Sequence, residues 1–461
     1  MRDPLASLVS DDLLAQAIGA VPARPGVEWA ELFLERCETR RVEWGPSGGP
    51  RLVPGMREGF AVRRVGPAEQ THHSEEGLDP ERILAACRRL EAGAPGVPAA
   101  GSRERRLAPD PAEGGALRER DGTALAATLE TLARRLTGRL GPALSFELSL
   151  ETRRRWIRVA LAGAAPRSDV QERAVLTCRL ALPGGGIVLG AGAVDLERLL
   201  ARHPEEEIGR EAGRSIEARD AREAPAGEAT VVLAPGTGGV FFHEACGHAL
   251  EADLVLNHAS PFRNLLGEKV AADFVGAMDD STQPGLEGGY ACDDEGSPCR
   301  GTVLIARGRL KAFLADRITG ARLGGGTTAN GRRESFRDLP LPRMSNTFLM
   351  AGTDDPDAIV RETPRGLYVR RLSGGSVDAA SGDFLFRAEG GSLIENGRLT
   401  APLRPFTIAG NGVSALRGID RVGGDLRFGT GAGSCGKEGQ KIPVAVGQPT
   451  LRLRSLAVRP G

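Results

Sequence analysis

The sequence predicts an α+β fold in which a mixed α/β region at the N-terminus precedes a β-rich C-terminal domain. Before residue 225, runs with strand-like alternation are interspersed with stretches of helical periodicity. After residue 290, short apolar runs follow one another, broken by Gly and by the hairpin-forming pair Asn396-Gly397. Segments rich in Gly, Pro and charge divide the chain into three predicted domains, at residues 1–110, 111–225 and 226–461.

The first domain is predicted to combine strands with one helix. Apolar alternation predicts strands at residues 27–36, 40–44 and 59–64. Pro80 predicts the start of a helix, because Pro is favoured at the first helical position. Residues 92–115 are rich in Ala, Gly, Pro and charge, and this composition predicts a linker or a surface loop.

The second domain is predicted to open with a helix, starting near Asp121 and continuing through Leu136. A charged helix is expected at residues 204–221, mostly facing solvent, and a Pro- and Gly-containing boundary follows it. Alternating strands are expected between the two helices, at residues 145–151, 156–162 and 174–182.

The third domain begins with a buried-strand pattern at residues 229–234. A Gly-rich turn then leads into a predicted helix that contains His243, Glu244 and His248. The chain has only six His, and two of them lie here with a carboxylate between them. Imidazole is a common zinc ligand, and a nearby Glu can accept a proton from water that the metal activates. The sequence therefore predicts a zinc-binding helix in this domain, with a catalytic Glu244.

The spacing of the two His is unusual for a regular helix. In the common metallopeptidase pair the two His are at i and i+4, about 40° apart around a helix of ~3.6 residues per turn. His243 and His248 are at i and i+5, about 140° apart. Both can face one ion only if a π-bulge adds a residue to the turn or the helix loosens at Gly247.

A catalytic zinc usually has a third protein ligand, and three residues compete for that place. Cys435 lies on a Gly-rich turn whose backbone can approach another segment closely. Glu251 has the spacing of a downstream helical ligand, although it can instead orient an imidazole. Cys246 ranks last, because a small buried thiol is the commoner fate of Cys. The pattern alone does not choose between Cys435 and Glu251. The acidic turn at residues 293–298 is flanked by Cys292 and Cys299. We expect it to be solvated, with a second metal site there as the alternative.

Composition limits the classes of function. Lys+Arg and Asp+Glu are equal at 60 each, so no basic field points to nucleic acid or to an anionic membrane surface. No apolar run is long enough to span a bilayer, and the first residues do not form the apolar core of a signal peptide. Seven dispersed Cys do not resemble a disulfide framework. We therefore expect a cytoplasmic protein without nucleic-acid or membrane partners.

Several ordered motifs resemble the TldD/PmbA peptidases, also called modulators of DNA gyrase. The resemblance is strongest from residue 236 to about residue 453, and the first 225 residues fit only loosely. The motifs that carry it are His243-Glu244-Ala245-Cys246-Gly247-His248, Asp293-Asp294-Glu295-Gly296, Asn330-Gly331-Arg332-Arg333-Glu334-Ser335, Pro342-Arg343-Met344-Ser345-Asn346-Thr347, Gly374-Gly375-Ser376-Val377-Asp378, Leu393-Ile394-Glu395-Asn396-Gly397 and Cys435-Gly436-Lys437-Glu438-Gly439-Gln440.

The resemblance implies the catalytic, TldD-type branch, because the PmbA (TldE) branch lacks the His-Glu motif. It implies Zn²⁺ held by His243, His248 and Cys435, with Glu244 as the catalytic carboxylate. It also implies cleavage of unfolded or leader peptides inside a closed dimer chamber, formed as a homodimer or with a PmbA/TldE-like partner. Cys246 departs from the family pattern, which has a small aliphatic residue there.

The resulting hypothesis is a zinc-dependent peptidase with Glu244 as general acid and base. Arg332 and Arg333 are candidates for stabilising the oxyanion by motif position only, and surface salt bridges are the alternative. A competing hypothesis is a non-catalytic peptide-binding subunit whose structural zinc has four ligands, with Glu251 as the fourth. Hydrolysis of amide bonds outside peptides is a further alternative.

Overall fold

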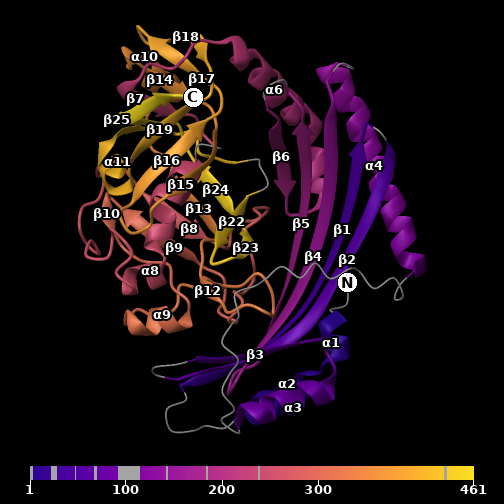
Figure 1. Ribbon diagram of the computed structural model, residues 1–461. Coiled ribbons are helices and arrows are strands. Elements are labelled where there is room, and N and C mark those ends of the chain that lie inside the picture. The colour runs from indigo at the N-terminus through magenta and orange to yellow at the C-terminus, as the bar shows by residue number, and fades with distance from the viewer. Residues whose placement is uncertain are drawn as a thin grey trace.

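The computed structural model describes residues 4–21, 28–46, 48–66, 70–91, 115–141, 144–182, 185–236, 239–429 and 433–461. Most of the predicted linker, residues 92–114, therefore lies outside the described residues. The structure confirms the predicted fold class, because a mixed α/β region precedes a β-rich C-terminal half (Figure 1).

One antiparallel sheet of six strands organises the N-terminal half, in the order β3-β2-β1-β4-β5-β6 (Figure 1). It contains strands from both sides of residue 110, and the division of the chain into three domains stays a prediction. The strands are β1 (Trp29–Gly45), β2 (Gly48–Val65), β3 (Gln70–Glu76), β4 (Phe146–Leu161), β5 (Arg167–Leu180) and β6 (Ile187–Ala193).

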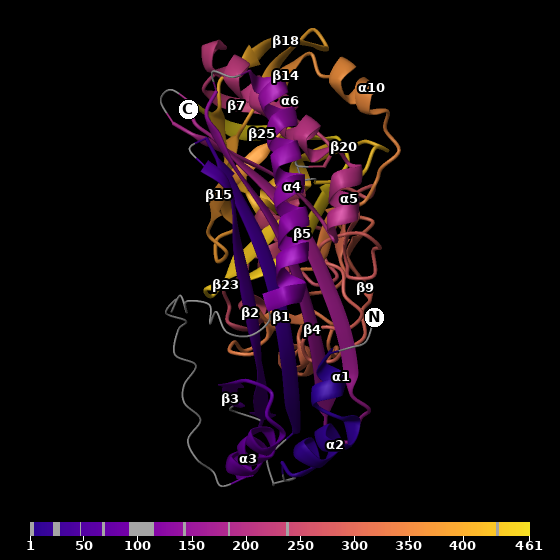
Figure 2. The same cartoon turned by 90° about the vertical axis from the view of Figure 1, so that its right-hand side faces the viewer.

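Helices cover the face of this sheet that points away from the C-terminal half. The long helix α4 crosses β1, β4 and β5 in Figure 2, while α1 to α3 lie at the lower end of the sheet. Buried Leu, Ile and Ala side chains of α4 and α6 form one core with the sheet, and α1 to α3 form a second core with it. The helices are α1 (Pro4–Leu8), α2 (Asp11–Gly19), α3 (Pro80–Glu91), α4 (Gly115–Leu140), α5 (Leu196–Ala201), α6 (Pro204–Glu217) and the 3-10 turn η1 (Ala218–Asp220).

The strands are longer than the side-chain pattern predicts. The strands expected at residues 27–36 and 40–44 form the single strand β1, and those at 145–151 and 156–162 form β4. The reason is that β1 and β4 pair without interruption from Glu31↔Leu161 to Trp44↔Leu148. Backbone pairing on both sides therefore keeps the intervening polar residues in the ladder.

Two further sheets form most of the C-terminal half. The first has the order β15-β16-β19-β25-β7-β14-β17-β18, with β20 pairing to β25, and the second has the order β10-β9-β8-β13-β24-β21. The first sheet contains β7 (Gly227–Leu233), β14 (Arg365–Val369), β15 (Leu372–Val377), β16 (Asp383–Ala388), β17 (Gly391–Glu395), β18 (Arg398–Leu403), β19 (Phe406–Asn411), β20 (Ile419–Val422) and β25 (Leu451–Pro460). The second contains β8 (Ala277–Asp280), β9 (Gly301–Ala306), β10 (Arg309–Leu310), β13 (Asn346–Leu349), β21 (Arg427–Phe428) and β24 (Ala445–Gln448).

Short elements complete this half. The predicted Asn396-Gly397 turn is confirmed, since both residues have positive φ and join β17 to β18. Two small hairpins pair β11 (Gly331–Arg332) with β12 (Leu341–Pro342) and β22 (Ser434–Lys437) with β23 (Gln440–Pro443). The helices are α7 (Val240–Phe242), the π-helix η3 (His243–Gly247), the 3-10 turn η4 (His248–Leu250), α8 (Ala252–Leu256), α9 (Arg317–Arg322), α10 (Pro356–Arg361) and α11 (Gly412–Gly418).

The two halves meet across an apolar patch and a buried network of charges. Phe33 and Val159 of the sheet pack with Cys292 and Phe336 of the C-terminal half. The expectation of a solvated acidic turn at residues 293–298 is wrong, because the sheet covers it and Asp293, Asp294 and Glu295 are buried. Among the helices that the structure describes, each is too short or too polar to cross a membrane.

Candidate metal centre

A strand and a tight turn deliver the His-bearing segment into the core. β7 lies between β25 and β14, so both of its edges are paired by backbone hydrogen bonds. The chain then turns at Gly236, whose φ of 81° favours Gly and whose N–H bonds the Gln448 carbonyl at 3.0 Å. At Gly239 a Cβ atom would lie 2.7 Å from the Gly447 nitrogen, so only Gly allows the two backbones to pack this closely.

The helical segment has the geometry that the His spacing requires. Residues His243–Gly247 form a π-helix and His248–Leu250 a 3-10 turn, which confirms the predicted departure from a regular α-helix. Closely packed residues constrain this π-helix. The Gly412 backbone packs against the Ala245 carbonyl, and Met344 packs against Gly247. A side chain at either Gly would collide with its neighbour.

Cys435 reaches this segment from a hairpin 187 residues further along the chain. It lies on β22, which pairs with β23 from Ser434↔Pro443 to Lys437↔Gln440. The connecting residues Glu438 and Gly439 both have positive φ, as two-residue hairpin turns require. The Cys435 side chain therefore points from a short, well-defined strand into the C-terminal core, where it is 3% exposed.

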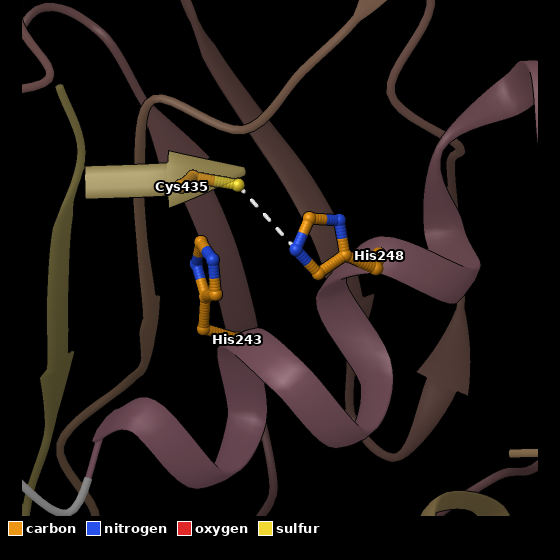
Figure 3. Close-up of side chains that lie close together, drawn as sticks. All are labelled: His243, His248 and Cys435. Carbon is orange, nitrogen blue, oxygen red and sulfur yellow. Dashed lines mark hydrogen bonds between the residues drawn. The ribbon is translucent and has the colours of Figure 1, made fainter. Parts of the chain in front are cut away.

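The three side chains converge at one point (Figure 3). One donor atom from each of His243, His248 and Cys435 lies within 4.8 Å of the other two. Cys435 Sγ is 3.4 Å from His248 Nε2, and the two imidazole rings meet edge to face with centroids 5.1 Å apart. The arrangement offers two nitrogens and one sulfur to a single ion, which is the donor chemistry of zinc.

The electrostatics of the cluster suit a cation. Burial opposes ionisation of Cys435, but hydrogen bonds from His243 and His248 outweigh it and lower the pKa of the thiol to about 5. A thiolate is the form that ligates a metal. Nδ1 of His243 is buried and has no hydrogen-bond partner among the described residues. A buried polar atom without a partner costs free energy. The unpaired nitrogen therefore fits a site in which these residues bind a metal ion.

Glu251 contacts His248 from the side away from the cluster. Its Oε2 accepts from His248 Nδ1 at 3.1 Å, which leaves Nε2 to face Cys435. Lys437 Nζ donates to the same oxygen at 3.0 Å, to Asp253 at 2.8 Å and to the Pro342 carbonyl at 3.0 Å. Burial raises the pKa of Glu251, but Lys437 and His248 outweigh burial and lower it to about 2. Glu251 therefore has the geometry of a carboxylate that orients an imidazole.

Glu244 lies on the same π-helix and remains accessible. Its side chain is 37% exposed, and its Oε2 is 3.9 Å from His248 Nε2. The predicted catalytic carboxylate therefore has solvent on one side and the donor cluster on the other.

Other residues named from the sequence lie elsewhere. Cys246 Sγ approaches the Gly412 carbonyl at 3.8 Å and is not one of the clustered donors. Arg332 donates to the Met344 carbonyl at 2.6 Å, and Arg333 pairs with Glu31 of β1. Both arginines are buried and engaged in contacts within the protein. They are therefore placed neither to stabilise an oxyanion nor to form a surface salt bridge. The N-terminal sheet covers this segment, which the local sequence does not reveal.

Lys437 and Arg343 are two residues of the site that the sequence reasoning did not single out. Arg343 is fully buried and donates to the Cys435 carbonyl at 2.7 Å. A signal for Lys437 does exist in the sequence. It follows Cys435 by two residues, so the two side chains share one face of a strand.

Residues 226–460 match the family described as PmbA/TldA metallopeptidase C-terminal domain. The chain belongs to the PmbA/TldD family. The resemblance inferred from the motifs is thereby confirmed, and the matched range begins with β7 and contains all three donors.

Named relatives agree with this assignment. A metalloprotease TldD homolog of Buchnera aphidicola is 40% identical over 237 residues, which cover 51% of this chain and 49% of the relative. A zinc metalloprotease TldD homolog of Saccharolobus solfataricus is 35% identical over 237 residues, which cover 50% and 52%. The chain thus spans about half the length of the curated relatives it matches. The crystal structure of TldE from Thermococcus kodakarensis has the same fold, with a TM-score of 0.71 at 17% identity over 94% of this chain and 97% of TldE.

Proposed function

We propose that this protein is a zinc-dependent peptidase in which His243, His248 and Cys435 hold the metal and Glu244 is the general base. The observation that carries the proposal is the convergence of the three donor atoms within 4.8 Å, beside an accessible Glu244. The relative from Saccharolobus solfataricus is named a zinc metalloprotease, and this name supports zinc as the bound ion.

Each residue of the site has its own role in the proposed hydrolysis. A bound zinc ion supplies a Lewis acid that polarises the scissile carbonyl and lowers the pKa of water towards ~7. Glu244 takes the proton from the attacking water and passes it to the leaving amine. Glu251 holds His248 in the orientation that presents Nε2, and Lys437 holds Glu251 through a 3.0 Å hydrogen bond.

The alternative of a structural zinc needs a fourth protein ligand. Glu251 was the candidate, but it is engaged with His248 Nδ1 and Lys437 on the far side of the imidazole. Within the described ranges only three donors converge. A site with three protein ligands and one open position is the catalytic type.

We further propose that the substrates are unfolded or leader peptides. β15 is the edge strand of the larger C-terminal sheet, and residues 374–376 in it are exposed. It contacts α7, the helical turn that directly precedes His243. An extended peptide that adds to this edge gains main-chain hydrogen bonds beside the metal centre, and a folded protein offers no such free strand.

The working form proposed is a dimer, either of two copies or with a TldE-like subunit. The structural likeness to TldE supports a pairing of similar subunits. We place the protein in the cytoplasm, and the free state of all seven cysteines supports a reducing compartment.

The expected result is that the zinc-loaded protein hydrolyses a reduced and carboxymethylated protein but not the native, disulfide-bonded form of the same protein. Fragment patterns by mass spectrometry measure both reactions. A chelator should stop hydrolysis and added Zn²⁺ should restore it. Equal cleavage of the folded and unfolded forms would overturn the proposed substrate class, and chelator-resistant cleavage would overturn the zinc mechanism.

A further inference from the structure

Gly433, two residues before Cys435, is held by a charged side chain of the N-terminal sheet. Arg173 of β5 donates through Nη2 to the Gly433 carbonyl at 2.6 Å. The carboxylate of Glu287, from the C-terminal half, lies beside this contact and interacts electrostatically with Arg173. Both side chains line a cleft of about 790 Å³ between the N-terminal sheet and residues 281–291, and Pro443 of the hairpin lines it as well.

The position of Gly433 fixes the start of the hairpin that carries Cys435. β22 begins at the next residue. The N–H of Val444, the residue that follows β23, donates to the Gly433 carbonyl at 3.4 Å. A Cβ at residue 433 would collide with the Val444 carbonyl, so the backbone is packed without free space. A movement of Gly433 is therefore transmitted over two residues to the Cys435 sulfur. Metal sites require their ligands within about 0.5 Å of the productive geometry.

Hydrogen bonds from the hairpin's own half do not replace this contact. Arg343 binds the Cys435 carbonyl and Lys437 binds Glu251, so they hold the middle and the end of β22. Arg173 holds the residue that enters it, and Glu287 lies beside Arg173. The bond from Arg173 has a charged donor, and such a bond is stronger than one between neutral groups.

Burial of the Glu287 carboxylate is energetically unfavourable. Burial raises its pKa to about 7, against the opposing effects of Arg173, Arg202 and the Gly433 N–H. Its Oε1 is buried with no hydrogen-bond partner among the described residues. A buried carboxylate held in this way is a feature typical of functional sites.

We propose that Arg173 and Glu287 are positioning residues for the Cys435 thiolate, so that the N-terminal sheet completes the metal centre. The inference rests on the proposed function, because it takes Cys435 as a metal ligand. It also assigns a role to Arg173, which lies outside residues 226–460 of the family match.

Titration of the metal-free full chain with Co²⁺ tests this proposal. The thiolate-to-cobalt charge-transfer absorption reports ligation by Cys435 independently of activity. Arg173→Ala and Glu287→Leu are expected to raise the Kd for Co²⁺ by about 10-fold or more, as loss of outer contacts to ligands does, and to weaken the absorption per bound ion. Glu287→Gln keeps the size and polarity of the side chain beside Arg173 and should stay near wild type.

Arg179→Ala is the matched control, since Arg179 is an exposed arginine six residues along the same strand. Its Kd and spectrum should equal those of the wild type. Wild-type values in Arg173→Ala, or an equal loss in Arg179→Ala, would overturn the proposal. If Arg173→Ala lowers the melting temperature of the metal-free chain, the Glu287→Leu and Glu287→Gln pair decides the question. A wild-type protein without the thiolate absorption would instead refute the ligand set on which the proposed function depends.

Discussion

Glu244→Gln is expected to lower kcat for peptide hydrolysis by about 10²- to 10⁴-fold, while the protein keeps its full zinc content. Gln has the shape of Glu but cannot accept a proton from water. The Glu244 side chain is 37% exposed and lies 3.9 Å from His248 Nε2, so the substitution changes no buried contact of the donor cluster. The loss should therefore fall on the proton transfer and not on the metal.

The measurement combines kcat on an unfolded protein substrate with elemental analysis of the purified variant. Glu268→Gln is a suitable control, because Glu268 is an exposed carboxylate of the same half of the chain. Near wild-type turnover in Glu244→Gln would refute its role as general base. Loss of zinc from this variant would show that Glu244 acts on the metal site and not on the proton.

Arg63→Met is expected to lower the free energy of unfolding by about 3–5 kcal/mol. Arg63 of β2 is fully buried, donates to Glu31 of β1 at 2.8 Å and also pairs with Glu295 of the C-terminal half. Removing the guanidinium leaves Glu295 buried without this cation. Such an uncompensated charge costs far more than the pair contributes, because its desolvation is no longer offset.

Urea titration of wild type and variant measures the difference. Arg41→Met is the control, because Arg41 pairs with Glu151 on the surface of the same sheet, where about half of the Arg41 side chain is exposed. Exposed pairs contribute about 0–1 kcal/mol, so the control should unfold close to the wild type. Equal effects of the two substitutions would show that the buried network does not stabilise the junction of the two halves.

Local features of the fold could be predicted from the sequence because they depend on neighbouring residues. Pro80 starts α3, and Asn396-Gly397 forms the turn between β17 and β18. The spacing of His243 and His248 required a departure from the α-helix, and the chain forms a π-helix there. In each case the conformation follows from the residue types within one or two turns.

Features that depend on distant segments could not be predicted in this way. The residue types at 293–298 predict a solvated turn, yet the N-terminal sheet buries its three carboxylates and supplies Arg63 to Glu295. Cys435 and Glu251 were equal candidates for the third ligand, because nothing local shows which of them faces the cluster. The hairpin brings Cys435 to His248 Nε2, and Lys437 of the same hairpin draws Glu251 to the opposite nitrogen.

The most direct test of the metal centre is the metal content of the purified chain by elemental analysis, for wild type, Cys435→Ala and Cys246→Ala. Both substitutions remove one buried thiol, but only Cys435 belongs to the donor cluster. We expect about one zinc per chain in the wild type and in Cys246→Ala, and little or none in Cys435→Ala. Full zinc retention in Cys435→Ala, or a wild type without zinc, would contradict a centre built from His243, His248 and Cys435.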